Sequence, residues 1–505
     1  MNTIILFLCG ALLACPALAL LFNCFSGRKK AVSAARLASL FIGFGFTTGL
    51  FLLGHLNFSE MPVTYMLISF NNLSLLLCNL ILLVSFIVHR FSLRYMDGDR
   101  LYWRYFCNLA AITLSAVVMA LADNIFLFWL SWSLSNLLLI VLMVHKSEWA
   151  AARNSGRLTL NTLLVGSISL LAAFMLITFS AETASIQALN QKDMISFSVF
   201  IPAMTLITLT ALTQSAIWPF HRWLISSLNS PTPVSALMHA GLVNGGGILI
   251  VKFAPLFAAS NHLLMIVFVL GVLSAFLGTF WKLMQHDIKK MLACSTLAQM
   301  GFMMLQCGLG LFAAAVAHLC WHGLFKAYLF LSSGSVVAQK SNTPKIHAYQ
   351  PIVLLFASIG GILGMLGFAF MTNKPILSLQ ATSFLLVFAF IAGTQMMLTV
   401  MSNRLSIINM AIGLLMSSLA SLIYGASIHL IELSLPNLTQ FYLAKLSILH
   451  LITLALLVLP WFLFNLGLMK KIKESNFWCR FYMNLFNQSQ PSPKTVTTLR
   501  SDYKY

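Results

Sequence analysis

Three titratable side chains recur at intervals of four residues within one apolar run, AAAVAHLCWHGLFKAYLFLSSGSVV, as His318, His322 and Lys326. On an α-helix this spacing places all three on one face, in a stripe about 12 Å long at a rise of 1.5 Å per residue. Ionisable groups inside an apolar run are costly, so they mark functional sites by default. Because imidazole and ammonium groups exchange protons, we interpret the stripe as a proton relay.

Two other interpretations of these residues compete with the relay. Both histidines would be hydrogen-bonded core residues, with the lysine extending its ammonium to the membrane surface. Alternatively, two histidines four residues apart have a zinc-ligand spacing, although only Cys320 stands nearby as a further ligand. The threefold recurrence on one face favours the relay.

A second run, SPTPVSALMHAGLVNGGGILIV, contains His239. Pro231 and Pro233 open it, and three glycines loosen its middle: Gly245, Gly246 and Gly247. Such a run predicts a discontinuous helix, which membranes tolerate where the exposed backbone lines a wet cavity. The same glycines also suit a face for close helix packing. We predict a functional role for His239.

Lys289 follows Asp287 at the start of another apolar run. It is either the inner mouth of a proton path or an ordinary loop lysine of the kind that marks the cytoplasmic side. Acidic residues are nearly absent from the apolar runs, so the sequence argues against a transporter that carries protons on buried carboxylates.

The composition identifies the class of protein that must hold these side chains. Of 505 residues, 59% are hydrophobic and 8% are charged, whereas soluble proteins carry about 25% charged residues. Soluble enzymes, DNA-binding domains, fibrous proteins and disordered chains are therefore excluded, and an all-α polytopic membrane protein remains. Apolar runs of spanning length predict about fifteen transmembrane helices, at 3–22, 35–57, 71–89, 105–121, 124–145, 158–178, 196–220, 231–251, 262–281, 291–308, 311–338, 350–371, 377–402, 406–428 and 441–468.

The net charge of +19 has a topological explanation. With the N-terminus outside and the runs alternating, 24 of the 30 Lys and Arg residues fall on the cytoplasmic side. We therefore expect a multi-pass protein of the inner (cytoplasmic) membrane, in contact with lipid and not with nucleic acid, with its N-terminus periplasmic and its C-terminus cytoplasmic. The polar end of the chain predicts a partly disordered cytoplasmic tail that contacts a partner.

Four segments carry a resemblance to a known superfamily: ADNIFLFWLSW, NSPTPVSALMHAGLVNGGG, HDIKKMLACSTLAQMGFM and HLCWHGLFKAYLFLSSGSVV. They resemble the antiporter-like subunits of respiratory complex I and of multisubunit cation/proton antiporters. The resemblance implies a core of two inverted five-helix repeats with discontinuous helices. It implies N-terminal helices at 1–104, the repeats at 105–251 and 252–402, C-terminal helices at 403–468 and a tail at 469–505.

Within this superfamily, PFHRWL followed by PTPVSALMHAGLVNGGG looks most similar to the DabB family, the membrane subunits of energy-coupled inorganic carbon pumps. The resemblance implies a partner similar to DabA, a large soluble zinc protein resembling carbonic anhydrase. This chain would conduct cations, and the partner would hydrate CO2 to bicarbonate. We expect no cofactor in this chain, with zinc in the partner. We also expect no enzymatic activity of its own, because no nucleophile–base set, metal site or nucleotide loop is present.

Two alternative functions remain open at this point. One is an antiporter-like proton-translocating subunit of complex I or of a multisubunit Na⁺/H⁺ antiporter. The other is a scaffold that anchors a soluble partner without transporting anything. The coupling ion, H⁺ or Na⁺, also stays open.

The resemblance carries over titratable residues of the second repeat, whereas the charged pair of the first repeat has no counterpart. Lys289 and the stripe of His318, His322 and Lys326 stand where the family has titratable groups. The family's fifth-span glutamate falls on Ser133, or on Leu130 in another register, and its seventh-span lysine falls on Gln214. Losing only one partner of a buried ion pair would leave an unpaired charge, at a cost of about 3–5 kcal/mol. The absence of both the glutamate and the lysine avoids that cost, so the two differences from the family are consistent with each other. For the family's twelfth-span ionisable residue, the candidates are Gln395 and Lys374.

Overall fold

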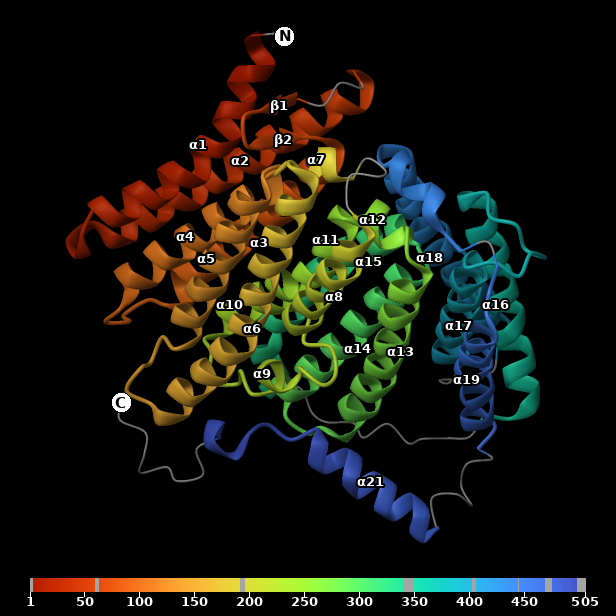
Figure 1. Cartoon of the computed structure of the whole chain (residues 1–505). Coiled ribbons are helices and arrows are strands. Elements are labelled where there is room, and N and C mark those ends of the chain that lie inside the picture. Colours follow the sequence, from red (N-terminus) through yellow and green to blue (C-terminus); the bar gives the residue numbers. More distant parts are fainter. Residues whose placement is uncertain are drawn as a thin grey trace. The chain divides into compact units, whose positions relative to one another are not determined.

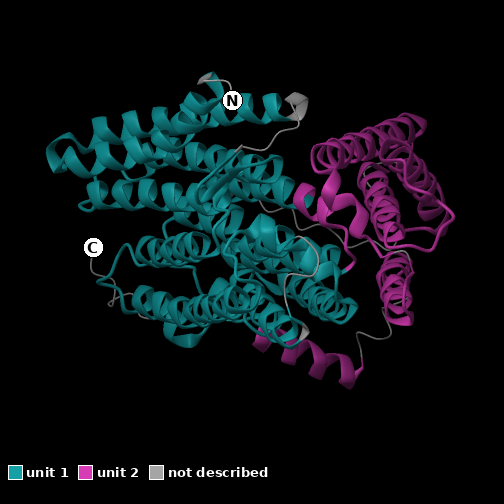
Figure 2. Ribbon diagram, turned by 45° about the horizontal axis from the view of Figure 1, so that its top comes forward, with its two compact units in different colours: residues 1–308, 318–337, 489–505 teal, residues 309–317, 338–488 magenta. Residues whose placement is uncertain are grey.

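The computed structural model describes residues 3–59, 63–190, 196–338, 349–401, 406–443, 445–467 and 475–496. Figure 1 shows that these residues are almost entirely helical, with one small hairpin. The chain divides into two compact units (Figure 2): unit 1 holds residues 1–308, 318–337 and 489–505, and unit 2 holds 309–317 and 338–488. The predicted all-α membrane class is confirmed. The repeat boundaries stay a prediction, because compact units follow packing and not symmetry.

Thirteen helices among the described residues are long and apolar enough to cross a membrane. Two further helices complete the predicted set: α8 (Phe197–Gln214), which contains the shorter apolar stretch Ser198–Gln214, and α14 (Ile288–Gly308). Each of the fifteen predicted runs falls on one helix or on one broken helix. The chain is therefore a multi-pass membrane protein.

Unit 1 begins with a helical hairpin and continues through a set of antiparallel helices (Figure 1). Its elements before the first helix break are α1 (Thr3–Phe25), η1 (Arg28–Lys30), α2 (Ala31–Ser59), β1 (Val63–Tyr65), β2 (Ile68–Phe70), α3 (Asn72–Tyr95), α4 (Tyr102–Leu121), α5 (Ile125–Met143), α6 (Ala150–Ala181) and α7 (Ile186–Leu189). Helix starts are capped by side chains, as at Asn124, whose Oδ1 accepts from two backbone N–H groups of α5.

The remaining elements of unit 1 include the helices that position the site. They are α8, α9 (Arg222–Ile225), α10 (Thr232–Ala240), η2 (Leu242–Asn244), α11 (Gly245–Lys252), α12 (Ala254–Ala258), α13 (Asn261–Met284), α14, most of α15 (Phe312–Leu331), η3 (Ser333–Ala338) and η5 (Pro493–Thr495). Helices α13 and α14 pack closely, because glycines such as Gly271 and Gly301 bring the two backbones together.

The predicted discontinuous helix is broken between α10 and α11. Side chains satisfy the carbonyls that the break frees, as a membrane interior requires. Gln214 donates to the carbonyl of Leu242 over 3.1 Å, Ser215 donates to that of Val243 over 2.7 Å, and Asn244 donates to that of Ala240 over 2.7 Å.

The predicted proline and glycine positions take separate roles at this break. Pro231 caps α10 and Pro233 lies in its first turn, so both mark where the helix starts. Gly245, Gly246 and Gly247 follow the break and begin α11. A Cβ at Gly246 would overlap the carbonyl of Ala211, and one at Gly247 would overlap Met303. These glycines therefore serve close packing of α11 against α8 and α14.

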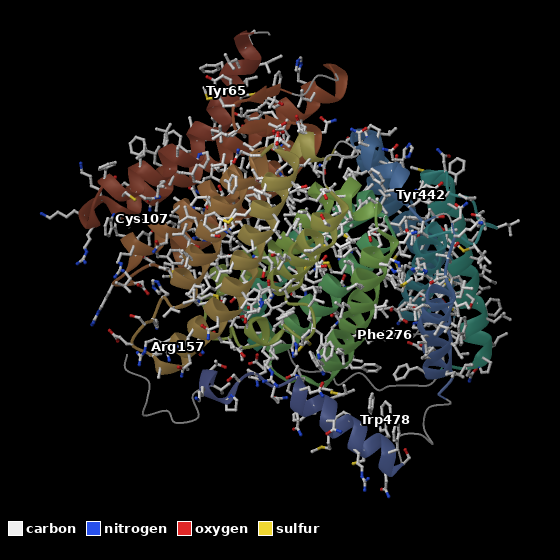
Figure 3. All side chains as sticks on the ribbon, in the orientation of Figure 1. Tyr65, Cys107, Arg157, Phe276, Tyr442 and Trp478 are labelled. Carbon is white, nitrogen blue, oxygen red and sulfur yellow. The ribbon has the colours of Figure 1, made fainter. Side chains whose placement is uncertain are left out.

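Unit 2 consists of the start of α15 and a helical group that follows it in sequence. Its further elements are α16 (Pro351–Thr372), α17 (Thr382–Met401), α18 (Ile407–Ser434), η4 (Pro436–Phe441), α19 (Ile448–Asn465) and α21 (Asn476–Gln488). Small residues bring α16 against its neighbours, since Gly361 faces Thr394 and Gly364 faces Ser421. Trp478 is one of several aromatic side chains on α21 (Figure 3).

The expectation of a partly disordered tail is corrected for residues 475–496. This stretch contains α21, followed by a segment of unit 1, 489–496, that is hydrogen-bonded to the rest of that unit and that we call the strap. Asn154 and Asn229 donate to the carbonyls of Lys494 and Thr495, over 2.9 and 2.8 Å. Gln285 donates to the hydroxyl of Ser489 over 2.8 Å. These partners replace the water that would otherwise keep such a polar segment unfolded. Residues 468–474 and 497–505 of the predicted tail lie outside the described residues.

Candidate functional site

Lys326 lies on α15 with its side chain against α14. Its ammonium nitrogen donates to the carbonyl of Leu292 over 3.2 Å and to the hydroxyl of Ser295 over 2.7 Å. Only 1% of the residue is exposed. Burying an unpaired polar group costs about 1–3 kcal/mol and more for a charged one, so these two acceptors make the position tenable.

His239 joins the same hydrogen-bond network from α10. The hydroxyl of Thr296 donates to the carbonyl of Leu292 over 3.0 Å, and Nδ1 of His239 lies 3.1 Å from that hydroxyl. Because the single hydroxyl proton points to Leu292, the oxygen accepts from Nδ1–H, which assigns the tautomer. Lys326 and His239 are thus connected through one carbonyl and one hydroxyl. The imidazole also stacks on Phe330 at 4.3 Å between ring centroids.

His322 and His318 continue the stripe along α15. Their rings stack at 5.8 Å between centroids. The ring of His322 hydrogen-bonds the backbone of His239, and the ring of His318 hydrogen-bonds the backbone of Gln299. The Nε2 atoms of both rings are buried and have no partner among the described residues. Each imidazole therefore has one nitrogen held in place and one at which a proton or a water molecule can be received.

Lys289 stands in the first turn of α14 and is half-buried. Its ammonium donates to the carbonyl of Ser230 over 3.1 Å, immediately before α10 begins. Both Lys289 and Lys326 are close enough to act electrostatically on His239. The structure thus brings together all five residues that the sequence analysis proposed as a path: His239, Lys289, His318, His322 and Lys326.

The sequence analysis missed the polar stripe of α14 that links these residues. Ser295 and Thr296 face α15 and α10, and one turn later the backbone of Gln299 meets His318. The two adjacent hydroxyl residues were visible in the apolar run HDIKKMLACSTLAQMGFM, whereas the backbone contact of Gln299 has no sequence signal. The Leu292 carbonyl accepts from both Lys326 and Thr296, so it holds the titratable side chains in place and does not itself carry a proton.

A different pair occupies the first half of unit 1. Gln214 on α8 and Asn136 on α5 exchange two hydrogen bonds, Nε2 to Oδ1 over 2.9 Å and Nδ2 to Oε1 over 3.0 Å. Both residues are buried. From the sequence, the family's glutamate position was assigned to Ser133. In the structure, the side chain that faces Gln214 is Asn136, one helical turn later. The buried hydroxyl of Ser133 has no partner in the described part of the chain. Asn136 was missed because only the positions that align with the family's glutamate were considered.

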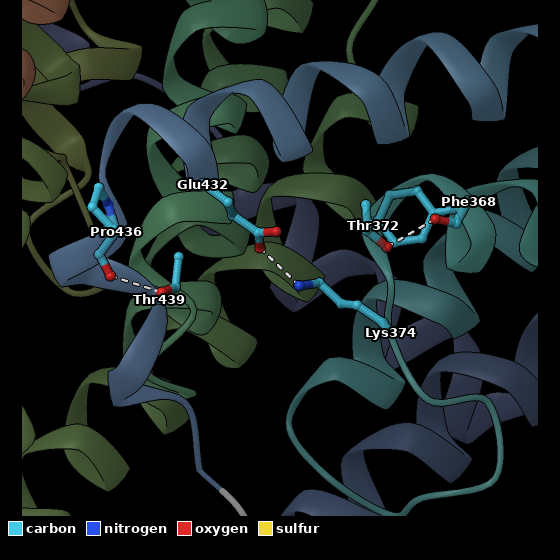
Figure 4. Close-up of polar contacts among 6 residues, drawn as sticks. All are labelled: Phe368, Thr372, Lys374, Glu432, Pro436 and Thr439. Atoms are coloured by element: carbon cyan, nitrogen blue, oxygen red, sulfur yellow. Dashed lines mark hydrogen bonds and ion pairs between the residues drawn. The ribbon is translucent and has the colours of Figure 1, made fainter. Parts of the chain in front are cut away.

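Unit 2 has its own charged pair beside a cavity of about 290 Å³. The ammonium of Lys374 lies 2.7 Å from a carboxylate oxygen of Glu432 (Figure 4). The hydroxyl of Thr382 lines the cavity and is buried without a partner in the described residues. Of the two twelfth-span candidates, Lys374 is thus paired and largely buried, whereas Gln395 is exposed on α17. Whether either residue replaces the family's ionisable group stays a prediction.

The zinc interpretation of the histidine stripe needs further ligands beside His318 and His322. Within the residues that the structure describes, no three His, Cys, Asp or Glu side chains are grouped so as to hold a metal ion. The proton-relay interpretation of His318 and His322 stays a prediction.

Comparison with known proteins places the chain in a family. The family model described as NADH:quinone oxidoreductase/Mrp antiporter, TM, matches residues 122–408, more than half of the chain. The model described as NADH-Ubiquinone oxidoreductase (complex I), chain 5 N-terminus, matches residues 60–106.

Several named relatives share this region. The chain is 39% identical to a probable inorganic carbon transporter subunit DabB1 of Halothiobacillus neapolitanus, over 50% of this chain and 47% of that protein. It is 35% identical to a probable inorganic carbon transporter subunit DabB of Bacillus subtilis, over 60% of this chain and 61% of that protein. A chain 5 of NADH-ubiquinone oxidoreductase from Schizophyllum commune is 32% identical over 63% of this chain and 45% of that protein. The match thus spans roughly half the length of these relatives.

A solved structure shows the same fold. The Mrp complex from Dietzia sp. DQ12-45-1b aligns with a TM-score of 0.58 and 18% identity, covering 95% of this chain and 52% of the chain in that structure. Together with the family match across α5 to α17, which includes every residue of the buried network, this establishes the chain as a member of the NADH:quinone oxidoreductase/Mrp antiporter transmembrane family.

Proposed function

We propose that this chain is the membrane subunit of an energy-coupled inorganic carbon pump. In this proposal it conducts protons through Lys289, His239, Lys326, His322 and His318, and the energy drives CO2 hydration to bicarbonate in a soluble partner. The observation that carries the proposal is the buried hydrogen-bond chain from Lys326 through Leu292 and Thr296 to His239. The names of the bacterial relatives, inorganic carbon transporter subunits, support the choice of substrate.

The partner in this proposal is a DabA-like soluble protein that carries zinc and resembles carbonic anhydrase. The complex lies in the inner membrane, with the N-terminus of this chain periplasmic and its C-terminus cytoplasmic. Reporter fusions near Glu60, which lies outside the described residues, and after Lys470 test the orientation. A cytoplasmic signal near Glu60 or a periplasmic one after Lys470 contradicts it.

Proton passage needs no large movement of the backbone in this arrangement. A proton arriving at Lys289 reaches the region of His239, whose Nδ1–H is already directed at Thr296. The hydroxyl and the Leu292 carbonyl orient His239 and Lys326 without titrating themselves. His322 and His318 then accept and release the proton at Nε2, the atom of each ring that has no protein partner in the described structure.

A second candidate function rests on a specific observation. Chain 5 of NADH-ubiquinone oxidoreductase matches at 32% identity, and the fold aligns with an Mrp complex. An antiporter-like subunit of either complex would use the same stripe. The neutral Asn136–Gln214 pair argues against this candidate, because the family resemblance implies a charged pair there.

Growth of a carbonic-anhydrase-deficient cell in air tests the proposal. We expect rescue when this chain is expressed with its soluble partner and no rescue when it is expressed alone, since no residue set here can hydrate CO2. Rescue by the chain alone refutes the two-component proposal. Failure of the pair to rescue, together with Na⁺/H⁺ exchange in vesicles, favours the second candidate.

A further inference from the structure

Unit 1 contains a cavity of about 50 Å³ beside the Asn136–Gln214 pair, between α3, α4, α5, α8 and the α10–α11 break. Its walls are mainly apolar, with side chains such as Ile112 and Leu237, and small residues such as Ala116 and Gly241 leave the room. A buried water occupies about 10–15 Å³ in this measure, so the cavity admits about three or four water-sized groups.

The polar groups on the cavity wall are nearly all paired with one another. The hydroxyls of Ser85 and Thr113 lie 2.6 Å apart, the hydroxyl of Ser135 donates to the backbone of α5, and Gln214 is held by Asn136. The exception is Trp132, which is 2% exposed and lines the cavity. Its indole Nε1–H has no partner in the described residues.

This lining selects a narrow class of ligand. An ion is excluded, because no charged side chain lines the cavity and burial of an unpaired charge is very costly. Water is less suited, because the walls are mainly apolar and their single donor without a partner in the described residues is the indole N–H of Trp132. A neutral molecule of about three heavy atoms, with an apolar body and a terminal acceptor, matches both the volume and the single N–H group.

We propose that this cavity binds one molecule of CO2, with a terminal oxygen accepting from Nε1–H of Trp132. The choice of CO2 among small neutral acceptors rests on the proposed function. The cavity lies where the family resemblance implies an ion pair. With Ser133 and Gln214 at the family's charged positions and Asn136 bonded to Gln214, the pocket is free of charge and holds the neutral substrate, while protons move through the other half of unit 1.

Pressurised structures test binding directly. The full-length chain in lipid nanodiscs is exposed to CO2 or, in parallel, to xenon, and its structure is determined. We expect both in the cavity of the unaltered protein. Ala116→Leu adds three carbon atoms and should exclude both, whereas Trp132→Phe keeps a six-membered aromatic ring, removes the indole N–H and should lose CO2 while retaining xenon. Ala111→Leu, on the same helix and away from the cavity, should change nothing.

Each contrary result overturns the proposal. Ordered water or a lipid chain in place of CO2 makes the cavity a hydrated or lipid-filled void, and full CO2 occupancy in Trp132→Phe removes the role of the indole. In cells with the partner, Ala116→Leu should raise the CO2 needed for growth by about tenfold relative to Ala111→Leu. Equal requirements contradict the role in uptake. If the unaltered chain, expressed with its soluble partner, supports no growth at all, the proposed function fails. The pressurised structures still decide whether the cavity binds CO2.

Discussion

Two polar regions of unit 1 are buried to the same degree and differ in what they can do. Between α14, α15 and α10, the lysine, histidine and threonine side chains each have a proton to give or an open atom to receive one. Between α5 and α8, Asn136 and Gln214 hold each other by two hydrogen bonds. Amides do not titrate in the physiological range, so this pair cannot exchange a proton, whereas the histidine and lysine side chains of the first region can.

The difference shows how a membrane protein removes a charged pair without unfolding. A buried ammonium facing a neutral side chain would lack its counter-charge, at a cost of about 3–5 kcal/mol. A reciprocal amide pair satisfies each partner and carries no charge to desolvate. It also keeps the helix break intact, because Gln214 still donates to the carbonyl of Leu242. The fold around the helix break is thus compatible with a neutral pair at this position.

The largest effect is expected from removing the charge in the conducting region. Lys326→Ala should abolish carbon uptake while the protein still inserts and binds its partner, because the chain through Leu292 loses its end. His322→Ala should do the same, since it leaves about two helical turns between His318 and Lys326. Uptake is measured per assembled complex, with the exposed Phe325→Ala as the control on the same helix.

If His318, His322 and Lys326 have only a packing role, a different result is expected for uptake. Uptake would then fall only in proportion to the amount of protein. Normal uptake per complex in Lys326→Ala and His322→Ala would show that these residues pack and do not conduct.

The next effect comes from forcing a charge into the neutral region. Gln214→Lys should lower stability by about 3–5 kcal/mol, because the new ammonium is buried beside an amide. Adding Asn136→Glu should recover most of that loss by supplying a counter-charge. Thermal unfolding of the purified variants checks both. A single variant as stable as the double would mean that the region is wet, and the contrast between the two regions would then not hold.

A smaller effect is expected at the link between Lys326 and His239. Thr296→Val keeps the shape and removes the hydroxyl that orients His239, so uptake should fall about tenfold, which corresponds to about 1.4 kcal/mol and lies within the cost of leaving a buried donor without a partner. Thr296→Ser should retain uptake. Ser295→Ala should matter less, because Lys326 keeps the carbonyl of Leu292. Equal losses in all three variants would assign the effect to packing.

Much of this architecture was predictable from the sequence. Long apolar runs with few charges locate every membrane helix, because hydrocarbon admits little else. The spacing of His318, His322 and Lys326 predicted one shared face, and the structure places them on the buried face of α15. Such inferences need only local periodicity.

What the sequence could not supply depends on contacts between distant segments. Thr296 and His239 meet across 57 positions of sequence, and Asn136 and Gln214 meet across 78. Neither pair has a local signal, since hydroxyl and amide residues are common in helices. The helix break at Gly241 was expected at Gly245–Gly247, because a run of glycines reads as flexible although tight packing between helices keeps it helical.

The smallest expected effect concerns the strap and the mouth of the conducting region. Asn229 holds the carbonyl of Thr495 in the strap and belongs to the loop whose Ser230 carbonyl accepts from Lys289. Asn229→Ala removes one neutral hydrogen bond, worth about 0.5–1.5 kcal/mol. Uptake should therefore fall about two- to tenfold, with assembly unchanged. Asn154→Ala removes the neighbouring strap contact without touching that loop, and it should have a weaker effect. Equal losses of uptake in Asn229→Ala and Asn154→Ala would mean that the strap matters as a whole, and not because Asn229 helps to position Lys289.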